Sequence, residues 1–206
     1  MSMTESTIAA FCANTASKAP TPGGGSVAAL VGALGCALAE MVAQLTAGKK
    51  AYADAAPEME RILKEGEALR GELLSLIDAD CAAFGGYMRA LALPKETDAE
   101  KTVRREALRE AAASAANAPL RMARASARVL PLCETAVRCG NRGAVTDAMM
   151  AAMLSRAAVR SAVLNVRINL PSLGDKAAAA ALEAECAALE AEALRREEEI
   201  LALAAL

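Results

Sequence analysis

The stretch from Pro20 to Lys50, PTPGGGSVAALVGALGCALAEMVAQLTAGKK, joins the least helical residues of the chain to its most apolar segment. Proline disfavours a helical conformation in the residue before it, and three consecutive glycines raise the entropic cost of order. From Ser26 to about Ala47 the residues favour a helix, and Gly48 is typical of the position just after a helix ends. The stretch therefore predicts a long apolar helix that begins directly after a glycine-rich break.

The glycine-rich turn, Gly23, Gly24, Gly25 and Ser26, has two interpretations. It is either a flexible linker or a backbone site, where the free N–H groups at a helix start bind an anion or a heterocycle. It is not a phosphate-binding P-loop, because no Gly-Lys-Ser/Thr closes it and no strand precedes it. Small residues recur four apart after it, at Ala29, Ala33 and Ala37, which indicates a closely packed helix and disfavours the linker.

The remainder of the chain reads as further helices separated by short breaks. Pro119 is expected to begin a separate helix and Thr146 to cap another. The last segment carries apolar residues at intervals of four and three residues in turn, which is the spacing of a docking or pairing helix. No segment shows the alternation of a strand, so we predict an all-α protein, a single-domain bundle of long helices over residues 1–206. The expected helices cover residues 6–17, 26–47, 57–91, 98–116, 119–140, 146–170 and 176–206.

The composition excludes several classes of function. The chain has no histidine, which removes Ser-His and Cys-His nucleophile pairs and histidine metal sites, so no metal is expected. The formal net charge of −2 does not favour nucleic acid. The longest apolar run, Val27 to Ala39, is too short for a bilayer, and the first ten residues do not resemble a signal peptide. Six scattered cysteines without a Cys-x-x-Cys pair indicate buried thiols, and we expect a cytoplasmic protein without a membrane partner.

A set of motifs along the chain resembles the cyclodeaminase/cyclohydrolase family, which includes the cyclodeaminase half of formiminotransferase-cyclodeaminase and the stand-alone methenyltetrahydrofolate cyclohydrolases. The resemblance covers nearly the whole chain in the expected order. It implies an all-helical homodimer that acts on one-carbon tetrahydrofolates without a metal or nucleotide cofactor. The motifs are APTPGGGSVAA from Ala19, LTAGKKAY from Leu45, LIDADCAAF from Leu76, LPK from Leu93, APLR from Ala118, GN at Gly140, VTD from Val145 and LNVRINL from Leu164.

The resemblance leaves two activities open. A cyclodeaminase closes N10 of the folate onto the formimino carbon and expels ammonia, whereas a cyclohydrolase adds water to the methenyl bridge. Both reactions pass through a tetrahedral carbon between two nitrogens, and both need positioning and a general acid or base rather than histidine. The alternative from a different class is a non-enzymatic helical interaction protein, in which the glycine-rich turn only shapes a dimer.

Four side chains are candidates for catalysis: Asp147, Asp80, Lys49 and Asn165. Asp147 and Asn165 are 18 residues apart, which is five helical turns, so they share one helix face. Asp80 lies one turn before Phe84, and a carboxyl beside an apolar surface has a raised pKa suited to acid–base work. The alternatives are that Asp147 caps its own helix, that Asp80 is a solvated charge, and that neighbouring Asp78 takes its role.

Further residues are candidates for binding the folate. Gly23, Gly24, Gly25 and Ser26 are expected to contact it through the backbone, and Lys50 to meet its glutamate tail, although two lysines after a helix are often only solvated. Glu40 interrupts the apolar run and needs a partner or a ligand, so it is a candidate for recognising the pterin. Arg167 would bind a carboxylate or pair with Asp147 or Asp80. Asn169 would contact either the substrate or a neighbouring loop.

Overall fold

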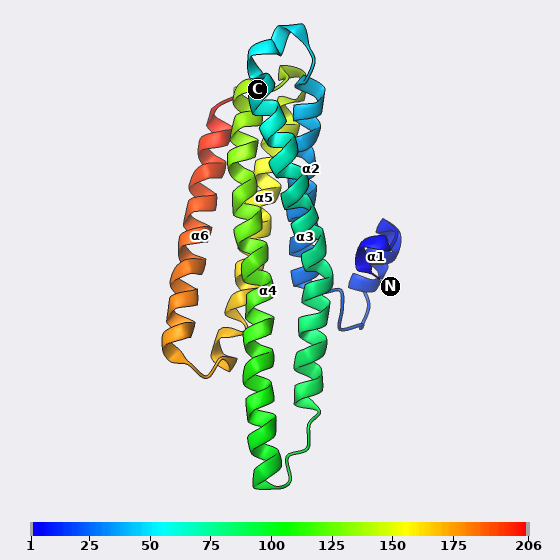
Figure 1. Cartoon of the computed structure of the whole chain (residues 1–206), viewed down its shortest axis with the longest axis vertical. Helices are drawn as coiled ribbons and strands as arrows, with labels where there is room; N and C mark the ends of the chain where they lie inside the picture. The colour runs from blue at the N-terminus through cyan, green and yellow to red at the C-terminus, as the bar shows by residue number, and fades with distance from the viewer. Residues whose placement is uncertain (1, 205–206) are drawn as a thin grey trace.

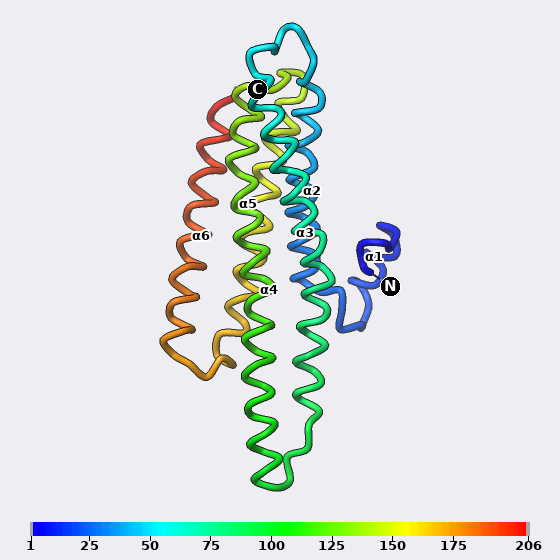
Figure 2. Tube along the Cα trace, in the orientation of Figure 1, coloured from blue at the N-terminus to red at the C-terminus, as the bar shows by residue number. Residues whose placement is uncertain are grey.

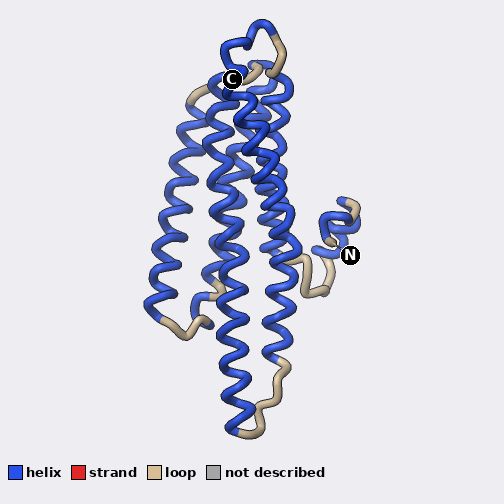
Figure 3. Tube along the Cα trace, in the orientation of Figure 1, coloured by secondary structure: helices blue, strands red, loops and turns tan. Residues whose placement is uncertain are grey.

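The computed structural model describes residues 2–204, and within this range it contains helices and loops but no strand (Figure 3). The predicted all-α fold is therefore confirmed. Four short 3-10 turns, η1 (Met3–Glu5), η2 (Lys50–Ala55), η3 (Arg142–Ala144) and η4 (Leu170–Ser172), connect or precede the helices. The α-helices are α1 (Ile8–Thr15), α2 (Gly24–Thr46), α3 (Ala56–Leu91), α4 (Asp98–Cys139), α5 (Val145–Arg167) and α6 (Lys176–Ala202).

Helices α2, α3, α4 and α5 form a bundle in which each packs against its neighbours, and α6 lies along α4 and α5 (Figure 1). Helix α1 is set apart from the bundle, and α3 and α4 continue beyond the other helices as a hairpin arm (Figure 2). Contacts at both ends show that helices α2 and α5 run in opposite directions. Gly24 at the start of α2 lies beside Asn165 near the end of α5, and Asn141, just before α5, bonds to Leu45 and Thr46 at the end of α2. The start of α2 and the end of α5 consequently lie at one level.

Helix α2 is the core of the bundle, and its small residues explain how closely its neighbours approach. A Cβ at Gly32 would lie 2.6 Å from Ser126 Oγ of α4, and one at Gly35 would lie 2.8 Å from Ser155 Oγ of α5. Among residues 2–204, α2 is also the one helix long and apolar enough to cross a membrane. Its packing against α3, α4 and α5 accounts for that composition, as expected for a buried helix.

The predicted break at Pro119 is wrong, because α4 is continuous from Asp98 to Cys139 with Pro119 and Pro131 inside it. A proline has no N–H, so Pro119 leaves the carbonyl of Ala115 without its helical partner. The side chain of Asn169 supplies the missing donor, with Nδ2 at 3.2 Å from Ala115 O. A contact from another element thus compensates for what the local sequence disfavours.

Several predicted helix ends also differ from the structure. Helix α1 spans only Ile8–Thr15, with Thr7 as its cap. Helix α2 begins at Gly24 rather than Ser26, so two of the three glycines form its first turn. The turn η3 leads directly into α5, so Ala144 rather than Thr146 holds the cap position, and α5 ends at Arg167 instead of Leu170.

Helix α6 packs on its own bundle. Cys186, Ala193 and Ile200 of its predicted apolar stripe are buried, and the helix contacts α4 and α5. Of the cysteines predicted to be buried, Cys36, Cys133 and Cys186 are buried, but Cys12 is exposed because the short helix α1 lies outside the bundle (Figure 1).

Candidate active site

A cavity of about 370 Å³ lies where the start of α2, the last third of α3, the middle of α4 and the end of α5 meet. It brings together six of the residues that the sequence singled out, from three separate segments: Gly23, Gly24, Gly25, Asp80, Asn165 and Asn169. Its other walls are mostly apolar or aromatic: Pro20, Thr21, Ala83, Phe84, Tyr87, Ala115, Pro119 and Ile168.

The glycines let a carboxylate approach the start of α2. Gly23 is the N-cap and provides no side-chain cap, so the first N–H groups of the helix are left for other partners. A Cβ at Gly25 would lie 2.6 Å from Cγ of Asp80, a distance that no real side chain tolerates. Only glycine at this position therefore allows Asp80 to lie against the positive end of the helix dipole.

Asp80 combines burial with a hydrogen bond from the same turn. Ser26 Oγ donates to Asp80 Oδ2 at 2.9 Å. Burial raises the pKa of the Asp80 carboxyl, while its hydrogen bonds with Ser26 act in the opposite direction. The net effect raises the pKa of the Asp80 carboxyl, and a raised pKa is a property expected of a carboxyl that acts as a general acid or base.

Asp78, the other carboxylate of this segment, binds the N-terminal segment of the chain. It accepts hydrogen bonds from the backbone N–H of Met3 at 2.8 Å and from Ser2 Oγ. These bonds lower the pKa of Asp78 and tie the N-terminal segment to α3. Asp78 does not line the cavity, so Asp80 is the carboxylate of this pair that faces it.

Two carboxamides, Asn165 and Asn169, line the same cavity as Asp80. Asn165 Nδ2 donates to Ser161 O at 2.8 Å, and Asn169 Nδ2 donates to Asn165 O at 2.8 Å. These bonds fix both amide groups and leave their Oδ1 atoms as acceptors for a ligand. Asn169 lines the cavity and also bonds to Ala115 of helix α4 rather than to a loop, and its contact with the substrate stays a prediction.

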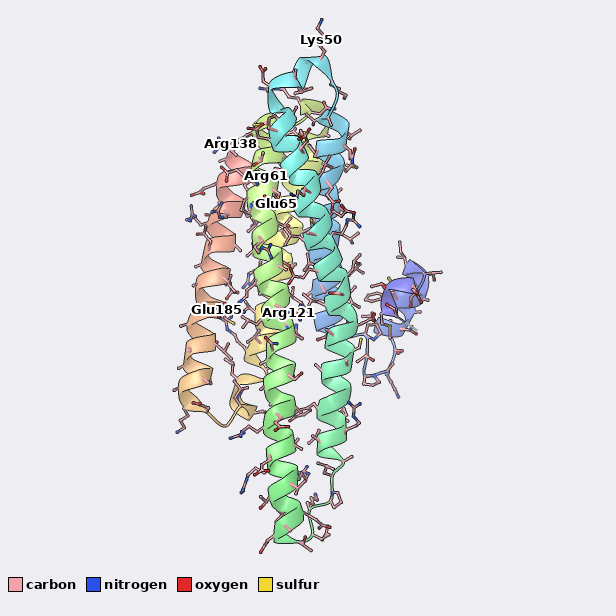
Figure 4. All side chains as sticks on the ribbon, in the orientation of Figure 1. Lys50, Arg61, Glu65, Arg121, Arg138 and Glu185 are labelled. Carbon is pink, nitrogen blue, oxygen red and sulfur yellow. The ribbon has the colours of Figure 1, made fainter. Side chains whose placement is uncertain are left out.

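Three candidates lie at the other end of the bundle. Helix α2 has 23 residues and is roughly 34 Å long at 1.5 Å per residue, and Lys49 and Lys50 follow its far end. Figure 4 shows Lys50 at the end of the molecule away from the hairpin arm. Asp147, in the first turn of α5, lies at the same end. Within one chain these residues are remote from the cavity.

Glu40 and Arg167 hold helices together. Glu40 accepts two hydrogen bonds from Arg70 of α3, at 2.8 and 3.2 Å, which supplies the partner that its position in the apolar run required. Arg167 pairs with Glu183 at 2.8 Å and Glu190 at 2.9 Å, so the expected pairing with Asp147 or Asp80 is wrong. Both pairs join the bundle across helix boundaries.

The sequence places Phe84 and Tyr87 beside Asp80, since they follow it by about one and two helical turns, and both line the cavity. The other apolar walls of the cavity were missed. Pro119 carried no such signal, because it faces the cavity only through the continuous path of α4. Ile168 is 76% exposed at the end of α5, one turn after Leu164, and the sequence marks it only as apolar.

The fold is an all-helical bundle, and its candidate site is a mostly apolar cavity that holds one half-buried carboxylate and two carboxamides. A family model described as formiminotransferase-cyclodeaminase matches residues 7–188. The chain is 42% identical over 173 residues to a methenyltetrahydrofolate cyclohydrolase of Methylorubrum extorquens, covering 84% of this chain and 83% of that protein. This chain belongs to the formiminotransferase-cyclodeaminase family.

Two further relatives support this assignment. Formimidoyltransferase-cyclodeaminase of Rattus norvegicus is 36% identical over 174 residues, which cover 84% of this chain but 32% of that longer protein. The crystal structure of formiminotetrahydrofolate cyclodeaminase from Thermotoga maritima superposes with a TM-score of 0.84 at 34% identity, covering 97% of this chain and 96% of that one.

Proposed function

We propose that this chain is a folate one-carbon enzyme that interconverts 5,10-methenyltetrahydrofolate and 10-formyltetrahydrofolate, a cyclohydrolase. The observation that carries the proposal is the position of Asp80, a half-buried carboxyl against the start of α2, in a cavity that also holds Asn165. The 42% identity to a cyclohydrolase of similar length favours this reaction. The likeness to the Thermotoga maritima structure favours a second candidate, the release of ammonia from 5-formiminotetrahydrofolate.

The proposed reaction uses the cavity residues as follows. Phe84 and Tyr87 pack against the flat rings of the substrate, and the amide oxygens of Asn165 and Asn169 accept hydrogen bonds from pterin N–H groups. Asp80 accepts a proton as the oxygen of a water molecule bonds to the methenyl carbon. The protonated carboxyl then gives this proton to N5 as the carbon–N5 bond breaks. The hydroxyl on the same carbon loses its own proton to water, and the resulting C=O leaves the formyl group on N10.

Both candidate reactions, the cyclohydrolase and the cyclodeaminase reaction, need a carboxyl that holds a proton for part of the catalytic cycle. The raised pKa of Asp80 suits this exchange, since a carboxyl of ordinary pKa protonates a nitrogen poorly at neutral pH. In the cyclodeaminase reaction, N10 takes the place of water, and the same carboxyl delivers the proton that leaving ammonia requires. Addition and elimination at this carbon need only such groups and positioning, so we propose that the enzyme uses no metal or nucleotide cofactor.

We also propose that the enzyme is a homodimer whose subunits meet through α2 and α5. Exposed apolar side chains stand on these two helices at Leu34, Met41, Leu45, Met150, Met153, Leu164 and Ile168. Leu34 and Met41, for example, are seven residues apart, which is the spacing of residues on helix-pairing surfaces. A second copy of the chain would cover this face, as isologous homodimer interfaces do.

An antiparallel arrangement of the two copies gives the distant candidates a role. If the twofold axis is perpendicular to α2, the Lys49 and Asp147 end of one copy meets the cavity end of the other. The substrate would then be held by Asp80 and Asn165 of one subunit with Asp147 and Lys49 of its partner. The six unpaired cysteines agree with a proposed location in the reducing cytoplasm.

Two measurements test the proposed function. We expect 5-formyltetrahydrofolate, a stable analogue, to raise the melting temperature, and a lack of stabilisation at millimolar concentration would favour a non-enzymatic interaction protein. We expect loss of the methenyl absorbance when 5,10-methenyltetrahydrofolate is added. Appearance of that absorbance with ammonia release from 5-formiminotetrahydrofolate would instead assign the cyclodeaminase reaction.

A further inference from the structure

The last turn of α5 is attached to α6 by one guanidinium group. Arg167, the final residue of α5, donates from Nε and Nη2 to the carboxylate of Glu183 at 2.8 to 3.1 Å, and from Nη1 to Glu190 at 2.9 Å. The two glutamates are seven residues apart, which is about two turns, so they lie on one face of α6. All three nitrogens of the guanidinium are therefore bound by α6, which the planar fork of an arginine allows.

The residues on either side of Arg167 belong to the wall of the candidate active site. Asn165 precedes it by two positions, and Ile168 and Asn169 follow it directly, and all three line the cavity. Arg167 does not line the cavity, because its side chain extends to α6. Within one chain it therefore acts on a ligand through the position of the turn that carries its neighbours.

This turn has one anchor on each side. Toward α4, Asn169 Nδ2 donates to Ala115 O at 3.2 Å, a hydrogen bond between neutral groups. Toward α6, the anchor is the charged pairing of Arg167, and charge-assisted hydrogen bonds are the stronger kind. Without Arg167, the amide groups of Asn165 and Asn169 would be held from the side of α4 alone.

A second ion pair joins the same two helices at a place without cavity residues. Helices α5 and α6 run in opposite directions, so the end of α5 meets the start of α6 (Figure 1). Arg156 lies eleven residues before Arg167 on α5 and bonds to Glu197 of α6 at 2.7 Å. Both side chains of this pair are less exposed than those of the Arg167 pairs, but the residues around Arg156 do not line the cavity.

We propose that Arg167 is a positioning residue of the enzyme, which fixes the last turn of α5 to α6 and so sets where the amide groups of Asn165 and Asn169 meet the substrate. The inference rests on the proposed function, in which those amides contact the pterin. Helix α6 then contributes to substrate affinity from outside the cavity. Asp80 stands on α3 and bonds to Ser26 of α2, so its proton transfer does not depend on this attachment.

The test compares R167Q with R156Q, by Kd for 5-formyltetrahydrofolate and by KM and kcat for 5,10-methenyltetrahydrofolate. We expect R167Q to raise Kd and KM about tenfold, the contribution of about one hydrogen bond to binding, while kcat stays within about twofold of the wild type. R156Q breaks the less exposed pair of the same helices, so it should lower the melting temperature at least as much but leave Kd and KM unchanged. R167K keeps the charge without the planar fork and should recover part of the affinity.

The outcomes distinguish the inference from the proposed function. If R167Q binds the analogue as tightly as the wild type, if R156Q weakens binding as much as R167Q, or if kcat of R167Q falls as far as KM rises, the inference is overturned and the proposed function stands. Failure of the wild-type protein to bind the analogue would overturn both. Circular dichroism checks that the variants fold. Should either arginine variant not fold, E183Q and E197Q weaken the same two attachments from α6 and carry the same expectations.

Discussion

At the scale of single residues, one contact carries most of the proposed chemistry. Asp80 reaches the start of α2 only because position 25 has no Cβ, and Ser26 of the same turn bonds to its carboxylate. The site is thus a relation between a glycine and a carboxylate 55 residues apart in the chain. Substitutions on either side of this contact should separate catalysis from stability.

We expect Asp80→Asn to lower kcat by about 10²- to 10⁴-fold, the usual contribution of a general acid or base. The stability effect has the opposite sign. Because the folded pKa of Asp80 is raised, ionisation destabilises the fold as pH rises from about 3.8 through that raised value. The amide removes this cost, so the melting temperature at pH 7 should equal or exceed that of the wild type.

Asp78→Asn is the control for this pH dependence. The folded pKa of Asp78 is lowered by its bonds to Ser2 and Met3, so its contribution to stability is present above pH 3.8 and lost as pH falls through the folded value. This variant should therefore be less stable than the wild type at pH 7 and should keep kcat. Melting curves and initial rates between pH 4 and pH 8 separate the two aspartates, and full activity of Asp80→Asn would contradict the assignment.

Gly24→Ala should weaken ligand binding far more than it lowers stability. A Cβ at Gly24 would meet the Asn165 amide at 3.6 Å, an ordinary contact, but it would project into the cavity. Its effect on the free energy of unfolding should stay within about 1 kcal/mol, the helix-propensity difference between the two residues. Gly25→Ala should instead displace Asp80 and lose both stability and activity. If Gly24→Ala instead lowers stability but binds the ligand as tightly as the wild type does, the turn has only a structural role.

At the scale of the helices, α4 shows how the tertiary structure overrides local preference. Its residues around Pro119 predict a break, yet the helix continues because Asn169 bonds to the carbonyl that the proline leaves free. The path of α4 through this point places Ala115 and Pro119 in the wall of the candidate active site. The continuity of one helix thus shapes the cavity.

A double-mutant cycle tests this compensation. Asn169→Ala should lower the free energy of unfolding by about 1 kcal/mol, because it leaves the Ala115 carbonyl without a donor. In a Pro119→Ala background the backbone N–H of residue 119 supplies that donor. Asn169→Ala should therefore lower the free energy of unfolding clearly less in this background. Urea unfolding of the four proteins measures the coupling. Equal costs in the two backgrounds would show that Asn169 does not support the helix.

At the scale of the whole molecule, the candidates from the sequence separate into two groups at opposite ends of the bundle. Asp80 and Asn165 lie at the cavity, whereas Lys49 and Asp147 lie beyond the far end of α2. The exposed apolar face of α2 and α5 runs between these ends. The proposed antiparallel dimer would bring the two groups together in each of two sites.

Mixing two inactive variants tests the shared site. After unfolding and refolding together, Asp80→Asn and Asp147→Asn chains should recover about a quarter of wild-type activity, because half the dimers are mixed and each mixed dimer has one intact site. Light scattering should give twice the mass of one chain. A monomeric mass, or no recovery from a dimeric mixture, would place Asp147 outside the site.

Much of the fold could be predicted from local patterns, because helix formation and burial follow from short-range periodicity. The apolar helix after the glycines and the existence of a C-terminal helix both carry that signal, but whether that last helix packs on its own bundle or on a second copy was left open by the sequence. Local patterns did not predict where α2 and α5 begin, or that α4 continues through Pro119. Each of these features depends on a neighbouring element. For the site, Gly25 and Asp80 were marked separately, but nothing in either segment indicated that they touch.

The amino-acid sequence by itself determined the all-helical class, the absence of histidine chemistry and the set of polar residues available to a site. These properties are local, since they depend on residue type and spacing along one helix. Only the tertiary structure decided which of those residues share a cavity, and that Glu40 and Arg167 pair with charged side chains of neighbouring helices. Those outcomes depend on how helices of opposite direction align, and that alignment is set by packing between segments far apart in the chain.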